Sequence, residues 1–281
     1  MSGTLYVVAT PIGNLEDITL RALRILRDVA VIAAEDTRRT ARLLAHHRIS
    51  TRTLSFHEHN VRARLPQLMS RLEAGTSVAV VSDAGTPGVS DPGLELVQAC
   101  IERGVPVDPI PGPSATLTAL VASGFPLVPF SFYGFPPARS KDRTPWLTLV
   151  CSITHTVVFF VPPHRVAALL KEMAPLLGNR PLMLGRELTK MHQEFVRGVA
   201  HDLAESLKEP RGEFTVVLGP MSQVLTHQVD MPDSQRVIEE FRHLTESAGL
   251  RRRAAVTALA RRYGRSAREV YARIEEGKRL S

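Results

Sequence analysis

Four short clusters of Gly, Pro, Ser, Thr and acidic residues each follow directly after a run of aliphatic residues. They cover residues 10–14, 35–38, 82–93 and 111–115. If the four runs are parallel strands, the clusters meet at the carboxyl edge of one sheet, where open α/β sheets bind ligands. Glycine there lets the backbone approach a ligand, and Asp83 or Asp91 can accept hydrogen bonds from hydroxyl or ammonium groups. Ordinary turns and helix caps are the alternative, but the coincidence at four strand ends favours a small-molecule site.

Other chemistries find less support in the residue spacing. Glu35 or Asp36 follows Gly13 at about the distance at which a Rossmann acid binds ribose, so a nicotinamide enzyme is a rival interpretation. The sequence, however, contains neither a Gly-x-Gly-x-x-Gly turn nor a Walker phosphate loop. The pattern at 57–59, His-Glu-His, has no third ligand at metal-binding spacing, and the two cysteines are not paired in a Cys-x-x-Cys motif. We therefore expect no metal site.

The elements that position these clusters follow from hydrophobic patterning. Strands are expected at 5–9, 29–33, 77–82 and 105–110, separated by amphipathic helices, which is the βαβ signature of a parallel sheet. A helix at 115–123 then leads into the Gly- and Pro-rich passage 124–128. The second half has expected strands at 130–135, 156–161, 181–184 and 214–218, with helices at 164–177 and 199–208. The chain is thus predicted to be α/β, with a mixed second half.

We place the domain boundary within 124–128. This gives a first α/β domain with a parallel sheet over 1–124, a second α/β domain over 125–222, and a linker with a basic helical segment over 223–281. Within 236–281 there are twelve basic and six acidic residues, so this segment carries +6 of the net charge of +7. Its apolar positions, which include Val256, Tyr263, Tyr271 and Ile274, suggest two short helices around 264–266.

The charge favours a polyanionic partner. Thirty of the 35 basic residues are arginines, whose planar guanidinium group suits phosphate, although genomic base composition is an alternative explanation. The N-terminus has no basic and apolar leader, and the most apolar stretch, 117–132, is interrupted by Gly124, Pro126 and Pro129. We expect a cytoplasmic protein that does not enter a membrane.

Five motifs together resemble one protein family. They are Ala-Thr-Pro-Ile-Gly-Asn-Leu-Glu-Asp-Ile-Thr (9–19), Ala-Glu-Asp-Thr-Arg (34–38), Asp-Ala-Gly-Thr-Pro to Asp-Pro-Gly (83–93), Pro-Gly-Pro-Ser-Ala (111–115) and Arg-Glu-Leu-Thr-Lys (186–190). Over about residues 4–220 the chain resembles the ribosomal RNA small-subunit methyltransferase I family, which shares the fold of the tetrapyrrole methylases and of diphthine synthase. The resemblance implies a two-domain tetrapyrrole-methylase-like fold with a cofactor cleft between the domains, and a helical C-terminal tail.

The resemblance also implies the chemistry. The cofactor would be S-adenosylmethionine, the substrate the 2′-hydroxyl of a cytidine in the decoding region of 16S rRNA in the small ribosomal subunit, and the protein a homodimer. The cofactor-binding residues implied by position are Pro11, Ile12, Gly13, Asp83, Ala84, Gly85, Thr86, Ser114, Ala115, Phe160 and Glu213.

The expected substrate-facing and catalytic residues are Arg186, Glu187, Lys190, His164 and Arg165. Glu187 or Lys190 could act as a base, and Arg186 or Arg165 could hold a phosphate. A structural ion-pair network at the domain junction is the alternative role for these residues. The sequence departs from the family at Val161, where a glutamate usually precedes the Pro-His-Arg step, so a role for that acid is not expected here.

Two other functions stay open at this point. One is a tetrapyrrole or other small-molecule methyltransferase on the same fold. The other is a catalytically inactive RNA-binding factor for ribosome assembly, to which the departure at Val161 lends weight.

Overall fold

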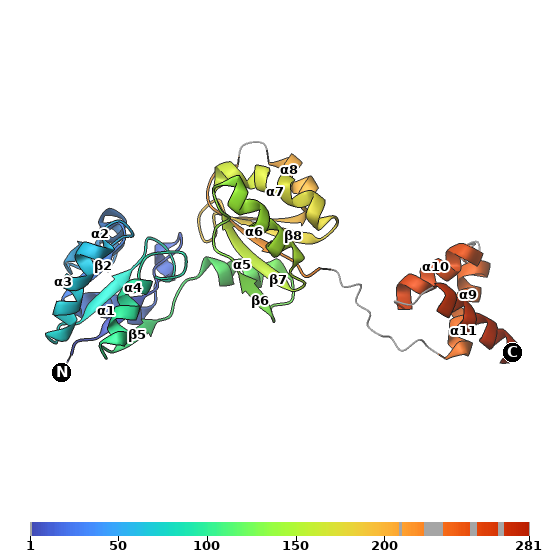
Figure 1. Ribbon diagram of the computed structural model, residues 1–281, viewed down its shortest axis with the longest axis horizontal. Coiled ribbons are helices and arrows are strands. Elements are labelled where there is room, and N and C mark those ends of the chain that lie inside the picture. The colour runs from blue at the N-terminus through green and yellow to red at the C-terminus, as the bar shows by residue number, and fades with distance from the viewer. Residues whose placement is uncertain (1, 208–209, 222–232, 248–251, 264–266, 281) are drawn as a thin grey trace. The chain divides into compact units, whose positions relative to one another are not determined.

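The computed structural model describes residues 2–207, 210–221, 233–247, 252–263 and 267–280. The chain divides into two compact units, Met1–Met221 and Ser222–Ser281 (Figure 1). The first unit contains two five-stranded sheets, and the second is helical throughout its described residues.

The first sheet is parallel and has the order β3-β2-β4-β1-β5. Its strands are β1 (Leu5–Val8), β2 (Val31–Ala34), β3 (Thr53–Ser55), β4 (Val78–Val81) and β5 (Val107–Ile110). The four expected strands are confirmed with shorter bounds, and β3 was not expected. Val29 lies outside β2 because it caps the preceding helix, where its N–H donates to Ile25 O at 3.1 Å.

Helices cover both faces of this sheet: α1 (Leu20–Asp28), α2 (Thr37–His46), α3 (Val61–Glu73) and α4 (Leu94–Glu102). Alternate strand residues point to opposite faces. Val31 and Val80 pack in one core with Leu68 of α3 and Leu96 of α4, whereas the neighbouring strand positions pack with α1 and α2. Because both of their faces are buried, the central strands β2 and β4 consist of uninterrupted apolar residues.

The second sheet is mixed, with the order β6-β7-β10-β8-β9. Its strands are β6 (Phe130–Phe132), β7 (Thr156–Val161), β8 (Pro181–Arg186), β9 (Glu194–Val199) and β10 (Phe214–Leu218); only β6 and β7 are parallel. The expected bounds of β7 and β10 are confirmed, the expected strand 130–135 is shorter, and the one at 181–184 continues to Arg186. The strand β9 was not expected.

One face of the second sheet packs against α6 (Ser140–Ser152), α7 (Pro163–Leu177) and α8 (Ala200–Ser206). The other face packs against α5 (Ala115–Ser123), whose predicted bounds are confirmed, and against Ile12 from the loop after β1. The helix expected at 199–208 ends at Ser206, and residue 208 lies outside the described residues. Helix α6 was not expected.

A buried arginine binds backbone carbonyl groups at one end of this sheet. Arg180, only 4% exposed, donates from Nε to Gly219 O at 2.7 Å, from Nη1 to Cys151 O at 3.0 Å and from Nη2 to His155 O at 3.0 Å. Its charge is therefore solvated by three backbone carbonyl groups.

The C-terminal unit contains α9 (Ser234–Arg242), a π-helical turn (His243–Ser247), α10 (Arg252–Tyr263) and α11 (Ala267–Leu280). The two helices expected around 264–266 are confirmed, and residues 264–266 themselves lie outside the described part. Leu259, Tyr263 and Ile274 are buried in the core of the unit, whereas Tyr271 is 58% exposed. No helix in the described residues is long and apolar enough to span a membrane.

Candidate cofactor and substrate site

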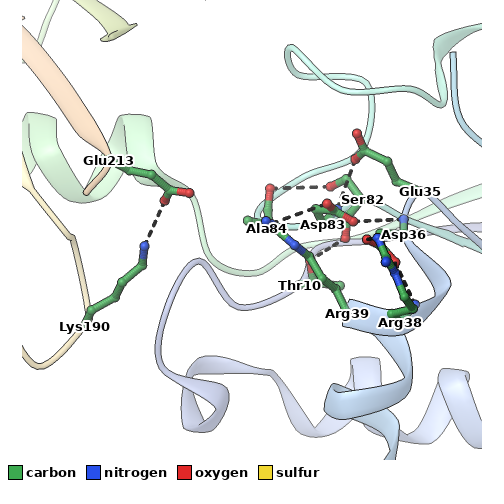
Figure 2. Close-up of polar contacts among 10 residues, drawn as sticks. All are labelled: Thr10, Glu35, Asp36, Arg38, Arg39, Ser82, Asp83, Ala84, Lys190 and Glu213. Carbon is green, nitrogen blue, oxygen red and sulfur yellow. Dashed lines mark hydrogen bonds and ion pairs between the residues drawn. The ribbon is translucent and has the colours of Figure 1, made fainter. Parts of the chain in front are cut away.

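The loops after β1 and β4 are joined by backbone hydrogen bonds. Thr10 N donates to Gly85 O at 2.8 Å, and Gly85 N donates to Thr10 O at 3.0 Å. Thr10 Oγ1 donates to Ser82 O at 3.1 Å (Figure 2). Gly85 has φ +81°, a left-handed conformation that favours glycine. The sequence prediction that these two clusters meet at one sheet edge is thus confirmed.

The loop after β2 is tied to the same place by Asp83. Its Oδ1 accepts from Asp36 N at 2.9 Å, its Oδ2 lies 3.4 Å from Arg39 Nη1, and its own N–H donates to Glu35 Oε2 at 3.2 Å (Figure 2). Both carboxylate oxygens of Asp83 are therefore already engaged. Asp83 holds the loops after β2 and β4 together, and it also lines the cavity described below.

Several carboxylates gather behind these loops. Burial raises the pKa of Asp91 to about 6, the charges of Glu35 and Asp83 add to the rise, and a hydrogen bond with Ser82 opposes it. Burial likewise raises the pKa of Glu35. This part of the loop cluster is thus poorly suited to a further anion.

The 186–190 segment forms a tight turn stabilised by Glu187. Its Oε1 accepts from Lys190 Nζ at 2.9 Å and from Glu213 N at 2.8 Å. Lys190 Nζ also lies 3.1 Å from Glu213 Oε2 (Figure 2). Glu187 and Thr189 have φ +49° and +65°, conformations that L-residues seldom adopt. Lys190 and Glu213, 23 residues apart in sequence, are held together here.

The ion pairs fix the charge state of this turn. Burial raises the pKa of Glu187, but the hydrogen bonds from Lys190 and from the Glu213 N–H, with the neighbouring positive charges, outweigh burial and hold the pKa below 4.5. Burial lowers the pKa of Lys190, but its two carboxylate partners outweigh burial and raise the pKa above 10.5. At neutral pH Lys190 is an ammonium group and cannot accept a proton.

The turn contacts the loop after β1. Asn14 N donates to Thr189 Oγ1 at 3.0 Å. A Cβ atom added to Gly13 would lie 2.5 Å from Lys190 Cγ and 2.9 Å from Leu188 O, so only glycine fits at this position. The two sheets of the first unit therefore contribute to one continuous site.

A cavity of about 520 Å³ opens where these segments meet. It is lined by Thr10, Pro11, Ile12, Gly13, Leu15, Arg39, Thr40, Arg42, Leu43, Ser82, Asp83, Ala84, Lys190 and Glu213. This volume lies within the range typical of small-molecule sites. One wall is apolar, and the rest of the lining carries cationic side chains from α2 and the 186–190 turn together with the carboxylates of Asp83 and Glu213.

Seven of the residues expected to form the site line this cavity: Pro11, Ile12, Gly13, Asp83, Ala84, Lys190 and Glu213. Gly85 is hydrogen-bonded to Thr10, which also lines the cavity, and Thr86 lies next to it in the same loop. Ser114 caps α5, accepting from Leu117 N at 3.4 Å, and Ala115 packs with the residues that bury Ile12.

The other expected residues do not line the cavity. The Phe160 ring packs against Phe132 and Phe135 at centroid distances of 4.9 and 5.3 Å. Arg165 donates to Pro136 O at 3.3 Å and to Pro137 O at 2.6 Å, so its guanidinium group fastens a loop.

The guanidinium group of Arg186 also binds other parts of the protein and does not line the cavity. It donates to Arg211 O at 2.8 Å and lies 3.4 Å from Glu194 Oε2. His164 is exposed in the first turn of α7, and Glu187 supports Lys190 from outside the lining. Val161 is 2% exposed in the core of the second sheet, where an acid would be buried among apolar side chains.

The contribution of α2 to the cavity was not predicted from the sequence. Arg39, Arg42 and Leu43 line the cavity from one helix face, as their spacing of three and four residues allows. The sequence did contain a signal for this contribution, because α2 begins at Thr37, within the cluster at 35–38. No described residues form a group of three or more His, Cys, Asp or Glu side chains suited to a metal.

Residues 4–204 match the family of tetrapyrrole (corrin/porphyrin) methylases. A ribosomal RNA small subunit methyltransferase I of Micromonospora olivasterospora is 50% identical over 220 residues, covering 77% of this chain and 70% of the relative. The protein of the same name from Halalkalibacterium halodurans is 41% identical over 271 residues, covering 96% and 93%.

Solved structures share the fold. A uroporphyrin-III-C-methyltransferase from Thermus thermophilus has a TM-score of 0.58 at 23% identity, covering 77% of this chain and 94% of that one. A structure of this Thermus enzyme with S-adenosyl homocysteine has a TM-score of 0.57 at 22% identity, covering 79% and 100%. A diphthine synthase has a TM-score of 0.61 at 14% identity, covering 77% and 90%.

The family match over most of the first unit, the identity to relatives along nearly the whole chain and the two-sheet fold all agree. The chain belongs to the tetrapyrrole methylase family and, within it, to the ribosomal RNA small subunit methyltransferase I family.

Proposed function

We propose that this protein transfers the methyl group of S-adenosylmethionine to ribosomal RNA of the small subunit, at the 2′-oxygen of a cytidine in the decoding region of 16S rRNA. The names of the relatives support an rRNA methyltransferase, and the Thermus structure with S-adenosyl homocysteine supports the cofactor. The observation that carries the proposal is the cavity that joins the strand-end loops to cationic side chains from α2 and from the 186–190 turn.

The lining residues fit such a cofactor. S-adenosylmethionine combines an apolar and aromatic portion with a charged amino acid portion, so it needs apolar walls, backbone hydrogen-bonding groups and a few polar side chains. Pro11, Ile12 and Ala84 supply the wall, and the backbone of Gly13 also lines the cavity. When bound, the cofactor supplies an activated methyl group.

The chain's own residues would then position the RNA. Arg39 and Arg42 line the cavity, and Arg42 has no ion pair with a described residue, so its guanidinium group is available for a phosphate. Lys190 adds a further positive charge but, as an ammonium group, does not remove the ribose proton. We propose that Lys190 orients anionic oxygens and that Glu187 positions Lys190. A cytoplasmic homodimer acting on the small subunit, as the resemblance implies, completes the proposal.

The experiment compares Arg42→Ala with Arg24→Ala, which removes the same charge from an exposed site on α1. We expect Arg42→Ala to raise KM for small-subunit RNA by about three- to tenfold, as for the loss of one partly exposed charged hydrogen bond, with unchanged cofactor affinity by calorimetry. Equal KM values for the two variants would contradict the placement of RNA at this cavity.

Two alternatives predict other outcomes. A small-molecule methyltransferase would methylate a tetrapyrrole and leave rRNA unlabelled, with no effect of Arg42→Ala on RNA. An inactive assembly factor would bind the small subunit without turnover of the cofactor. Incubating the wild-type chain with each substrate and labelled cofactor separates all three functions.

A further inference from the structure

The C-terminal unit has a cavity of its own, of about 510 Å³. It is lined by Phe241, Arg252, Arg253, Val256, Ala267, Arg268, Tyr271 and Ile274, which we call the arginine–tyrosine groove. The lining contains three arginines, one exposed tyrosine and no acidic residue. The cavity of the first unit shares no lining residue with this groove.

Helices α10 and α11 supply all the lining residues except Phe241, which belongs to α9. Arg252, Arg253 and Val256 share one face of α10, and Arg268 and Tyr271 lie three residues apart on α11. Ile274, one turn further along α11, is 1% exposed. The groove therefore has a rigid apolar floor that belongs to the packed core, with charged and aromatic groups above it.

The three arginines are exposed, and none of them forms an ion pair with a described residue. Arg252 and Arg253 are the first described residues of α10, and Arg268 is the second described residue of α11. The three guanidinium groups thus gather positive charge along the groove.

The tyrosines of this unit differ in environment. Tyr263 is 2% exposed, and its hydroxyl donates to Glu240 Oε2 at 2.5 Å, so it is part of the packed core. Tyr271 is 58% exposed and lines the groove beside the arginines. An exposed aromatic ring among guanidinium groups is the arrangement with which proteins bind single-stranded nucleic acid, by stacking on bases and contacting phosphates.

We propose that the arginine–tyrosine groove binds single-stranded RNA, with the Tyr271 ring stacked on a base and Arg252, Arg253 and Arg268 contacting the adjacent phosphates. The inference deepens the proposed function by adding a second RNA contact, on the C-terminal unit. The charge complementarity favours a polyanion, and the aromatic ring over an apolar floor favours one that carries planar bases.

The test uses the full chain and a short, fluorescein-labelled single-stranded RNA, with binding measured by anisotropy over a series of salt concentrations. The variants are Tyr271→Ala, Tyr271→Phe and Arg268→Ala. The matched control is Arg236→Ala, which removes one exposed charge from α9 of the same unit, outside the groove.

Loss of one base stack should weaken binding by about tenfold in Tyr271→Ala, whereas Tyr271→Phe keeps the ring and should bind within about twofold of the wild type. Arg268→Ala should lower the slope of log Kd against log salt by about 0.7, because one phosphate contact is lost. Arg236→Ala should keep the wild-type slope. All of these side chains are exposed, and circular dichroism checks that each variant is folded.

The inference fails if Tyr271→Ala and Arg268→Ala both bind like Arg236→Ala, or if Tyr271→Phe is as weak as Tyr271→Ala. It also fails if the wild-type chain prefers an acidic peptide or an anionic vesicle to the RNA. Should the wild type methylate rRNA while the groove variants bind normally, only this inference is wrong. If RNA binds through the groove while no rRNA is methylated, the proposed function is wrong and the RNA-binding role of the groove is supported.

Discussion

Replacing Glu187 tests how the 186–190 turn places Lys190 in the cavity. The Glu187 side chain is 19% exposed and accepts two hydrogen bonds, from the Lys190 ammonium group and from the Glu213 N–H. Glu187→Ala removes both acceptor contacts and leaves Lys190 with Glu213, whose side chain is 70% exposed. Glu187→Gln keeps one acceptor oxygen and removes only the charge.

The expected magnitude follows from these contacts. Hydrogen bonds to charged groups contribute about 1.5–3 kcal/mol each, and partial exposure places both here at the low end. We expect Glu187→Ala to lower the free energy of unfolding by about 2–4 kcal/mol and Glu187→Gln by about 1–2 kcal/mol. For a protein of this size, the Ala variant should then unfold about 4–12 °C below the wild type.

The pH dependence gives a second readout. The pKa of Glu187 in the folded protein lies below its ordinary value of 4.5, so its charge stabilises the fold fully above about pH 4.5. This contribution is lost as pH falls through the folded pKa. The difference between the wild type and Glu187→Gln should therefore be largest near neutral pH and should shrink in acid.

The assay is thermal unfolding followed by circular dichroism at several pH values, together with kcat and KM. Gly212→Ala is an independent perturbation, because a Cβ there would lie 2.5 Å from Glu187 Cγ and displace the carboxylate without removing its charge. We expect it to lower stability and kcat in the same direction. Wild-type stability and wild-type kinetics in both Glu187→Ala and Gly212→Ala would refute this account of the turn.

Two further predictions concern buried charge. Since burial and neighbouring carboxylates raise the pKa of Asp91 from 3.8 to about 6, wild-type stability should fall as pH rises through this range. Asp91→Asn should remove that decline and gain about 1–3 kcal/mol at pH 7, measured by urea unfolding; equal pH profiles would contradict it. Arg180→Met should destabilise the fold by about 3–5 kcal/mol, because three backbone carbonyl groups lose the guanidinium group as a donor. A variant that unfolds at the wild-type temperature would contradict this and show that water replaces the guanidinium group.

Much of the fold was predictable because apolar runs mark buried strands. The bounds of β7, β10 and α5 follow directly from their sequences. Strand β3 has only three half-buried residues at a sheet edge, so its pattern is weak. Strand β9 is the other sheet's edge and begins with exposed Glu194. Helix α6 contains Pro145 and has little amphipathic periodicity, so its sequence does not predict a helix.

The site was predictable where it depends on strand ends and less so where it depends on side-chain partners. The meeting of the loops after β1 and β4 follows from a parallel sheet. Spacing does not reveal that Arg165 binds two backbone carbonyls, or that Lys190 pairs with Glu213 from another strand's end. Likewise, Tyr271 follows the same apolar periodicity as the buried residues of α11 but lies outside the packed core. Only the three-dimensional arrangement distinguishes this exposed position from the buried ones.

Methylation of a ribose of small-subunit rRNA is the activity that we propose for this protein. Its most direct test is mass spectrometry of nucleosides from small subunits that lack the modification, after incubation with the purified protein and isotopically labelled S-adenosylmethionine. We predict label in 2′-O-methylcytidine, located by nuclease mapping in the decoding region of 16S rRNA. Label on a base, or unlabelled rRNA alongside a methylated tetrapyrrole, would contradict the claim.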